Sequence, residues 1–273
     1  MNILAQHEAV VPIDEPQIGS FLGAFLSDLP GADPRALTVS TFTLRRVQSR
    51  KDAQFFAEEF ADVWLPGLAR MMRERFYSHS QRKARGGSPG RRYIVIKEPN
   101  GSQSADVIMR ALPRAKLLFL LRDGRDVVDS ELAANLKDAW VSREFPGLGG
   151  VTDAQRLDFV VQSAQKWLWR TEVVQAAAAE HPGPVHLVQY EDLRALPDVA
   201  LRGILDWIGL SATDAEIASW VEKNSFERMP RTGPGEFVRI AVPGAWRENL
   251  RPDERTVLEE LLAPKLRELG YET

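Results

Sequence analysis

Three short apolar runs, separated by segments of helical periodicity, constrain the fold of this chain more than any other feature of its sequence. The runs are 93–96 (Tyr-Ile-Val-Ile), 117–121 (Leu-Leu-Phe-Leu-Leu) and 185–190 (Val-His-Leu-Val-Gln-Tyr). Each is too short for a core helix and is rich in the side chains that fill buried parallel strands. Between the runs, 102–112 and 158–181 carry apolar residues at helical spacing. This alternation predicts an α/β fold of three layers, with a mostly parallel sheet and helices on both of its faces.

The rest of the chain is consistent with one domain over residues 1–273, because neither an internal repeat nor a linker divides it. Further helices are predicted at 52–75, 196–208, 214–223 and 252–269. The basic, glycine-rich segment 81–92 leaves a helix and enters a strand, whereas a phosphate cradle leaves a strand and enters a helix. We therefore interpret it as a solvated connection.

Composition excludes several classes of protein. Hydrophobic residues make up 44% and charged residues 27%, which argues against a disordered chain, and a net charge of −3 gives no sign of a nucleic-acid partner. The chain has no cysteine and only four scattered histidines, so neither a disulfide framework nor a metal site is expected. With no membrane span and no export signal at the N-terminus, we expect a cytoplasmic protein.

Polar residues follow each predicted strand directly, where ligands bind in an open parallel sheet. They occupy 97–102, 122–130 and 190–193. Arg122, at a strand end and just before a helix, is suited to bind an anion together with the helix amides and the Ser130 hydroxyl. A salt-bridged turn built from the Arg-Asp-Gly-Arg-Asp segment explains the same residues equally well. On this segment alone the two interpretations are even.

The order of the motifs along the chain points to a family. Lys-x-Pro follows one strand, Arg-Asp-Gly-Arg-Asp-Val-Val-x-Ser follows the next, and Tyr-Glu-Asp-Leu follows the third. Ser-Phe-x-x-Met at 225–229 and a segment ending in Gly-x-Trp at 237–246 complete the series. This series resembles the PAPS-dependent sulfotransferases, closest to their tyrosylprotein and bacterial branch. The resemblance implies a P-loop NTPase-like sulfotransferase fold. It also implies in-line transfer of a sulfuryl group from PAPS (3′-phosphoadenosine 5′-phosphosulfate), a co-substrate used without a metal, to an acceptor hydroxyl.

The resemblance also implies roles for individual residues in binding the donor. Arg122, Ser130 and Arg239 match the positions that hold the 3′-phosphate, although the two residues after Arg239 depart from the Lys-Gly of many cytosolic members. Tyr190 and Phe226 match the positions beside the adenine. Ordinary packing in the core is the alternative for both aromatic residues, and for Phe226 it is nearly as good an explanation.

Two further residues match positions of the reaction centre. Lys97 corresponds to the lysine near the bridging and sulfuryl oxygens, where a fixed ammonium stabilises developing negative charge. Cytosolic members carry a histidine base two residues later, but this chain has Pro99 there. Glu15 matches the base of the tyrosylprotein branch, and Pro16 should restrict it to an extended backbone. The alternatives are a surface lysine and an exposed loop carboxylate.

The first strand of the family fold, and the Pro-Lys/Arg-Ser-Gly-Thr-Thr loop after it, have no counterpart in this sequence. Residues 1–7 resemble the second half of the helix that follows the loop, which would place the loop before Met1. We consider an internally assigned start, a truncated fragment and a degenerate member, and expect the sequence as written to be destabilised and nearly inactive. A nucleotide-binding pseudoenzyme and a P-loop-type nucleotide kinase are the alternative functions. The kinase lacks its Gly-Lys-Ser/Thr motif.

The acceptor is left open by the sequence. Sugars, lipids, small alcohols and tyrosine all carry the required hydroxyl, and the oligomeric state is equally open. Residues 140–150, which include Trp140 and Phe145, are predicted to form a loop over the pocket, and such loops set substrate choice.

Overall fold

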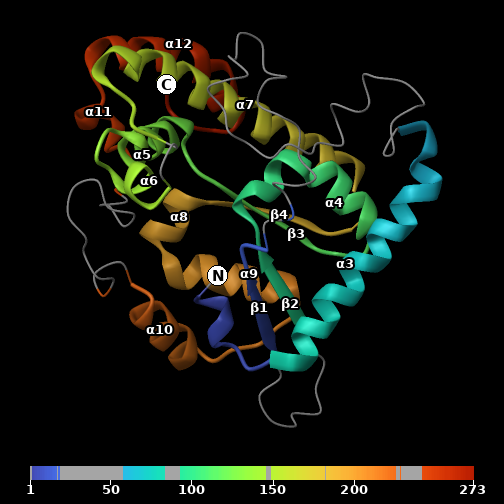
Figure 1. Cartoon of the computed structure of the whole chain (residues 1–273). Helices are drawn as coiled ribbons and strands as arrows, with labels where there is room; N and C mark the ends of the chain where they lie inside the picture. The colour runs from blue at the N-terminus through green and yellow to red at the C-terminus, as the bar shows by residue number, and fades with distance from the viewer. Residues whose placement is uncertain are drawn as a thin grey trace.

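The computed structural model describes residues 2–16, 18, 58–83, 93–145, 149–181, 183–225, 228 and 242–273. Figure 1 shows the chain from its N-terminus in blue to its C-terminus in red. No helix in the described part of the chain is long and apolar enough to cross a membrane.

Four parallel strands form the centre of the molecule. They are β1 (Val10–Asp14), β2 (Tyr93–Lys97), β3 (Leu117–Leu121) and β4 (Val185–Gln189). β1 pairs with β2 from Val10↔Tyr93 to Asp14↔Lys97, and β3 pairs with β4 from Leu117↔Val185 to Leu121↔Gln189. Within the described residues these are two separate two-stranded sheets. The three predicted strands are confirmed, but β1 was not predicted.

Helices follow the strands in the predicted alternation. The α-helices are α3 (Ala61–Lys83), α4 (Ala105–Ala111), α5 (Gly124–Asn135), α6 (Trp140–Glu144), α7 (Arg156–Glu180), α8 (Tyr190–Ala195), α9 (Pro197–Ile208), α10 (Asp214–Lys223), α11 (Trp246–Asn249) and α12 (Pro252–Glu268). Short 3-10 turns are η1 (Leu4–Gln6), η3 (Glu58–Phe60), η4 (Pro99–Ser104) and η5 (Asp153–Gln155).

Several predicted boundaries need correction. The helix placed at 52–75 is described only from Ala61 and continues to Lys83, and the one placed at 102–112 begins as the 3-10 turn η4. Trp140–Glu144 is a short helix, α6, rather than part of a loop. The N-terminal segment that resembled half a helix contains only the three-residue turn η1 before β1 begins.

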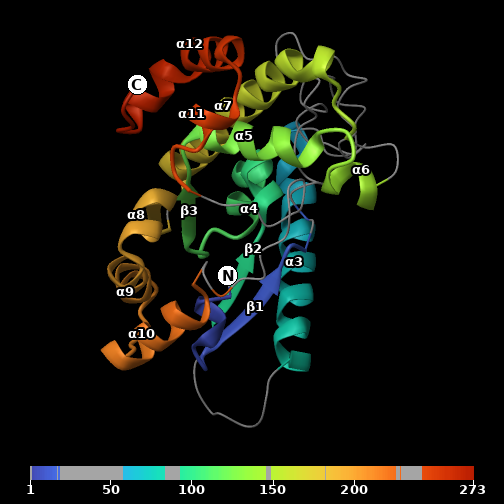
Figure 2. The ribbon, with the colours of Figure 1, turned by 90° about the vertical axis from the view of Figure 1, so that its left-hand side faces the viewer.

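Two helical layers cover the strands, as Figures 1 and 2 show. On one face, a core cluster joins side chains of both strand pairs to α9 and α10 (Val10, Val95, Leu118, Val188, Leu201, Leu205, Ile217). On the other face, α3 and α4 cover β1 and β2, and α4 and α7 cover β3 (Ile13, Ile94, Ile96, Met72, Val107; Leu117, Phe119, Val173). Because both pairs share these layers, the predicted three-layer α/β architecture is confirmed.

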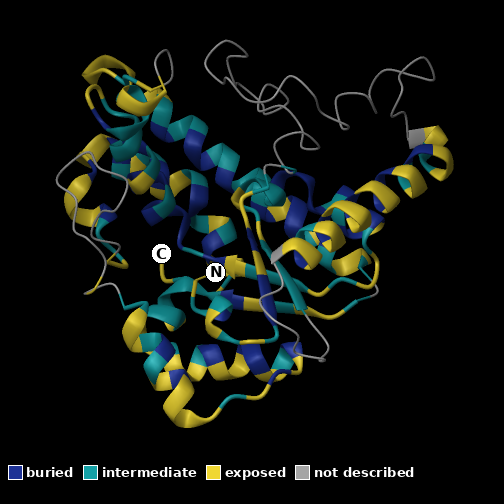
Figure 3. Cartoon of the chain, turned by 60° about the horizontal axis from the view of Figure 1, so that its bottom comes forward, coloured by how far each residue is buried: buried dark blue, intermediate teal, exposed yellow. Residues whose placement is uncertain are grey.

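A fourth core cluster attaches the C-terminal helix to the end of β3. Side chains of α5, α7 and α12 pack around Leu121 and Trp246 (Val128, Leu132, Ala164, Leu258, Leu262, Leu266). Gly124, at the start of α5, lies under the indole of Trp167, and a Cβ at this position would come within 2.7 Å of that ring. The helices bury the faces turned toward these cores and expose the opposite ones (Figure 3).

Candidate active site

The predicted site residues lie where the strands end. Glu15 follows β1, Lys97 ends β2, Arg122 follows β3 and Tyr190 follows β4. Within each parallel pair the two carboxyl ends lie together, because Asp14 is opposite Lys97 and Leu121 is opposite Gln189. This is the edge at which an open parallel sheet binds its ligands.

Lys97 and Glu15 form an ion pair. The Nζ of Lys97 lies 2.5 Å from Oε1 of Glu15 and 3.2 Å from Oδ1 of Asp14. Burial lowers the pKa of Lys97, but the hydrogen bonds and charges of Glu15 and Asp14 outweigh it and raise the pKa above its ordinary value. Lys97 is therefore a fixed ammonium, and both side chains of the pair keep about two fifths of their surface exposed (42% and 41%).

The backbone of Glu15 differs from the prediction. Its φ is +44°, in the left-handed region, so the expectation that Pro16 holds Glu15 extended was wrong. The amide of Glu15 still donates to the carbonyl of Lys97 at 2.8 Å, as the next bond of the β1–β2 ladder, and its carboxylate lies on the Lys97 ammonium. A residue other than glycine at positive φ costs about 1–3 kcal/mol, and such residues cluster at functional sites.

Arg170 of α7 fixes the turn that follows Lys97. Its Nη2 donates to Oδ1 of Asn100 at 3.2 Å and to Oε1 of Gln103 at 2.9 Å. Burial lowers the pKa of Arg170, and the nearby charge of Glu131 opposes that effect. The sequence analysis missed this residue, because nothing in the pattern of α7 distinguishes it from other charged residues of the helix.

Arg122 lies against Tyr190. The guanidinium carbon is 4.7 Å from the centre of the tyrosine ring, within the range of a cation–π contact. Among the described residues, the buried Nε of Arg122 has no hydrogen-bond partner. A buried guanidinium N–H without a partner is costly unless a ligand satisfies it, so Arg122 is placed to bind an anion.

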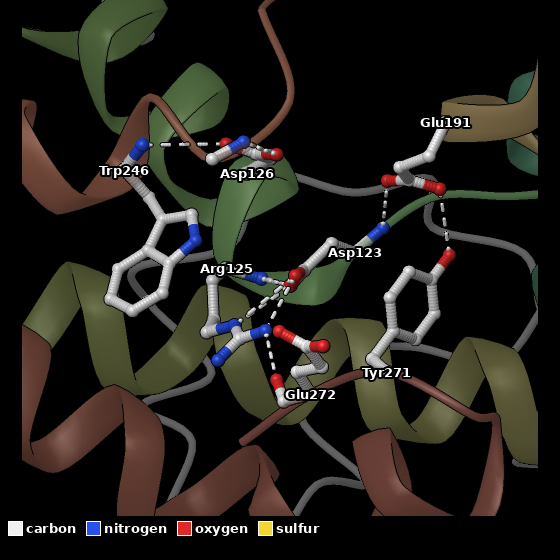
Figure 4. A network of polar contacts seen from close by, with 8 residues as sticks. Asp123, Arg125, Asp126, Glu191, Trp246, Tyr271 and Glu272 are labelled. Carbon is white, nitrogen blue, oxygen red and sulfur yellow. Dashed lines mark hydrogen bonds and ion pairs between the residues drawn. The ribbon is translucent and has the colours of Figure 1, made fainter. Parts of the chain in front are cut away.

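The two interpretations of the Arg-Asp-Gly-Arg-Asp segment apply to different residues. Arg125 forms the salt-bridged turn, with Nη2 2.7 Å from Oδ2 of Asp123, and only 3% of Arg125 is exposed. Asp126 accepts hydrogen bonds from the amides of Gly244 (2.8 Å) and Trp246 (3.3 Å), as Figure 4 shows for Trp246. The hydrogen bonds of this network come from Arg125, Gly244 and Trp246, and the charge of Arg122 acts on Asp126, where it opposes the rise in pKa that burial causes. Arg122 keeps the candidate role of anion ligand.

Three predicted residues of the donor site remain: Ser130, Phe226 and Arg239. Ser130 lies on α5 and is exposed. Phe226 and Arg239 lie outside the described residues, as do 237–241 of the predicted phosphate loop. In the part of the chain that the structure describes, no group of acidic or histidine side chains is arranged to hold a metal ion.

Comparison with known proteins identifies the family. The model of the sulfotransferase family matches residues 1–214, so the chain belongs to the sulfotransferase family. No curated protein matches the sequence.

Solved structures with a similar fold include three sulfotransferase-type proteins. A mouse sulfotransferase, SULT7A1, complexed with PAP matches with a TM-score of 0.48 at 16% identity, over 64% of this chain and 66% of its own. Retinol dehydratase in complex with androsterone and inactive cofactor PAP gives 0.45 at 18%, over 77% of this chain and 64% of its own. A sulfotransferase domain from the curacin biosynthetic pathway gives 0.49 at 14%, over 99% and 92%. This chain thus covers just under two thirds of the length of the first two proteins. With TM-scores below 0.5, these structures carry no argument about function.

Proposed function

We propose that this protein transfers a sulfuryl group from PAPS to the hydroxyl group of an acceptor. The observation that carries the proposal is the contact between Lys97 and Glu15 at the ends of two neighbouring parallel strands. In-line sulfuryl transfer needs a cation at the leaving oxygen and a group that takes the hydroxyl proton. An ammonium and a carboxylate in one place supply both.

In the proposed reaction, Glu15 removes the proton of the acceptor hydroxyl while the oxygen forms its new bond to sulfur. The bond between sulfur and the bridging oxygen breaks, and its electron pair stays on the 5′-phosphate of the donor. Lys97 stabilises the charge on that oxygen through a hydrogen bond, as cations do in phosphoryl transfer. The products are the sulfate ester of the acceptor, 3′-phosphoadenosine 5′-phosphate (PAP) and a protonated Glu15.

The ion pair itself suggests how donor binding prepares the base. Lys97 is shared between Glu15 and Asp14. When the oxygens of the donor bind the Lys97 ammonium, the ion pair between Lys97 and Glu15 becomes weaker. The carboxylate then becomes available to the acceptor at the moment when the donor is in place.

Arg122, Ser130 and Arg239 are proposed to bind the 3′-phosphate, and Tyr190 and Phe226 to contact the adenine. Two observations support the assignments of Arg122 and Tyr190: the Nε of Arg122 has no partner among the described residues, and the guanidinium lies over the Tyr190 ring. For the other three residues the assignment rests on the family resemblance alone. The acceptor is proposed to be a small alcohol, sugar, lipid or tyrosine hydroxyl.

The proposal is tested by binding and by transfer. The parent protein, which in this test includes any residues encoded in frame before Met1, is titrated calorimetrically with PAP. It is also incubated with ³⁵S-labelled PAPS and a panel of alcohols, sugars, sterols and tyrosine peptides. Arg122→Ala should weaken PAP binding about 10- to 150-fold, because loss of a charged hydrogen bond costs roughly 1.5–3 kcal/mol. Arg202→Ala, which removes an exposed arginine of α9 that pairs with Asp214 of α10, is the matched control and should bind like the parent. Failure of the parent protein to bind PAP refutes the proposal.

A further inference from the structure

The residues after α12 cross the loop between β3 and α5. Gly270 has a φ of +83°, which turns the chain at the end of the helix. The amide of Tyr271 donates to the carbonyl of Leu266 at 2.9 Å, and its ring packs beside the cluster formed by α5, α7 and α12. Figure 4 shows Tyr271 and Glu272 on one side of this loop, with Glu191 of α8 above them.

Glu191 connects the tyrosine to the loop. The hydroxyl of Tyr271 donates to Oε2 of Glu191 at 3.0 Å, and the amide of Asp123 donates to Oε1 of the same carboxylate at 3.0 Å. Glu191 thus contacts the residue after Arg122 and is itself the neighbour of Tyr190, on which Arg122 lies. The carboxylate of Glu191 therefore joins Tyr271 to the loop that begins at Arg122, and Glu191 is the residue after Tyr190.

Glu272 completes the connection through its main chain. Its carbonyl accepts a hydrogen bond of 2.7 Å from Nη2 of Arg125, whose guanidinium also bonds Asp123 and lies 4.6 Å from the centre of the Trp246 ring. Arg125 and Asp123 are both buried, with 3% and 7% of their surface exposed. Arg125 is therefore held within this network, so its charge is directed at Asp123 rather than at a ligand.

The hydroxyl of Tyr271 is in the protonation state that this arrangement requires. Burial raises its pKa far above the ordinary value, and the negative charge of Glu191 and the hydrogen bond to it raise the pKa further. The tyrosine is accordingly neutral and donates its proton to Glu191.

We propose that Tyr271 is a positioning residue for donor binding, acting through Glu191 on Arg122 and Tyr190. Tyr271 fixes the Glu191 carboxylate, whose other oxygen accepts from the Asp123 amide, so the hydroxyl of Tyr271 holds the start of the loop that follows Arg122. A guanidinium that is already held in place loses less conformational freedom when it binds a phosphate. The proposal rests on the proposed function, since it assigns Arg122 to the 3′-phosphate.

Tyr271→Phe removes only the hydroxyl and is the direct test. We expect the Kd for PAP to rise about 3- to 10-fold, as for the loss of one hydrogen bond, with the KM of the acceptor unchanged. In a Glu191→Ala background, where neither hydrogen bond to this carboxylate can form, Tyr271→Phe should have no further effect on the Kd. Tyr77→Phe, at a tyrosine of α3 that is 62% exposed, is the matched control.

A purely structural role for Tyr271 predicts a different pattern. The midpoint of thermal unfolding would fall, and the Kd for PAP would change equally in the presence and absence of the Glu191 carboxylate. That result, or an unchanged Kd in Tyr271→Phe, overturns the proposal while leaving the proposed function intact.

Amide hydrogen exchange gives a measurement that does not need the ligand. Tyr271→Phe should speed exchange of the Asp123 amide, which depends on Glu191, and should leave the amides of β1 and β2 unchanged. If the parent does not bind PAP, the proposed function fails. The exchange rate of Asp123 then still decides whether Tyr271 holds the loop, and an unchanged rate refutes that as well.

Discussion

Replacing Glu15 by glutamine removes the proposed base while preserving the size of the side chain and its ability to accept a hydrogen bond from Lys97. The Lys97–Glu15 pair is about two fifths exposed on both sides (42% and 41%). Exposed ion pairs contribute about 0–1 kcal/mol, so the free energy of unfolding should change by less than about 1 kcal/mol. A positioned base contributes about 10²–10⁴-fold to the rate, equivalent to roughly 3–5 kcal/mol of the barrier. Turnover should therefore fall far more than stability does.

The assay compares turnover with a saturating aliphatic alcohol, the Kd for PAP and urea unfolding in three proteins. Asp14→Asn is the matched control, because Asp14 is the other carboxylate that contacts Lys97, at 3.2 Å. We expect Asp14→Asn to stay within a few-fold of the parent. A phenolic acceptor, whose proton leaves more easily, should be affected less than an alcohol. Turnover of Glu15→Gln within a few-fold of the parent on the alcohol would refute the assignment of the base.

Two further predictions concern Lys97 and a buried ion pair. Lys97→Ala should lower the rate of transfer more than it weakens PAPS binding, because its charge acts mainly on the transition state; equal losses in single-turnover rate and Kd would make it an ordinary binding residue. The side chain of Glu254 is 1% exposed and accepts two hydrogen bonds from Arg156, at 2.6 and 2.9 Å. Burial raises the pKa of Glu254, but the bonds to Arg156 outweigh burial and lower the pKa below its ordinary value. Glu254→Gln should therefore cost about 3 kcal/mol of unfolding free energy in urea at pH 7. Because the pKa is lowered in the folded state, this contribution is present above the unfolded value of about 4.3 and is lost as the pH falls below it. The difference between variant and parent should shrink steadily as the pH falls through the lowered pKa of folded Glu254, and a constant difference would contradict the linkage.

Continuous apolar runs made three strands predictable, whereas β1 was missed for a physical reason. Its sequence, Val-Val-Pro-Ile-Asp, is short and has Pro12 at its centre, which argues against a central strand. Tyr93 donates to Ala9, and Glu15 donates to Lys97. Because backbone groups alternate along a parallel strand, the nitrogen of Pro12 faces away from β2. The missing N–H of proline is thus tolerated at the outer side of β1.

The candidate site was predictable in part, because motifs that follow successive parallel strands must gather at one edge. Arg122 and Tyr190 are in contact as that reasoning requires. Glu15 lies beside Lys97 at the same kind of edge, but only the family resemblance indicated it, because β1 was not predicted. The φ of Glu15 was not predictable, since the bond from its own amide to β2 overrides the preference imposed by the proline that follows. The loop expected before Met1 stays a prediction.

Contacts of the C-terminal segment could not be predicted from sequence. Tyr271 meets Glu191 across 80 positions, and Glu272 meets Arg125 across 147. No periodicity or local motif encodes such a pair, because it depends on how α12 packs on α5 and α7. The sequence shows only the chemical type of each of these residues, not that they are in contact.

The division of the strands into two pairs bears on how this protein behaves at high concentration. Tyr93 donates to Ala9 and Leu117 donates to Pro184, so the alternate residues Ile94 and Leu118 turn their backbone amides away from their partner strands. Leu120, on the same side of β3, is 51% exposed. Apolar strands with an open edge are templates to which another chain adds a strand. Among the described residues neither of these edges pairs with a further strand. Aggregation during expression should therefore start at these two edges.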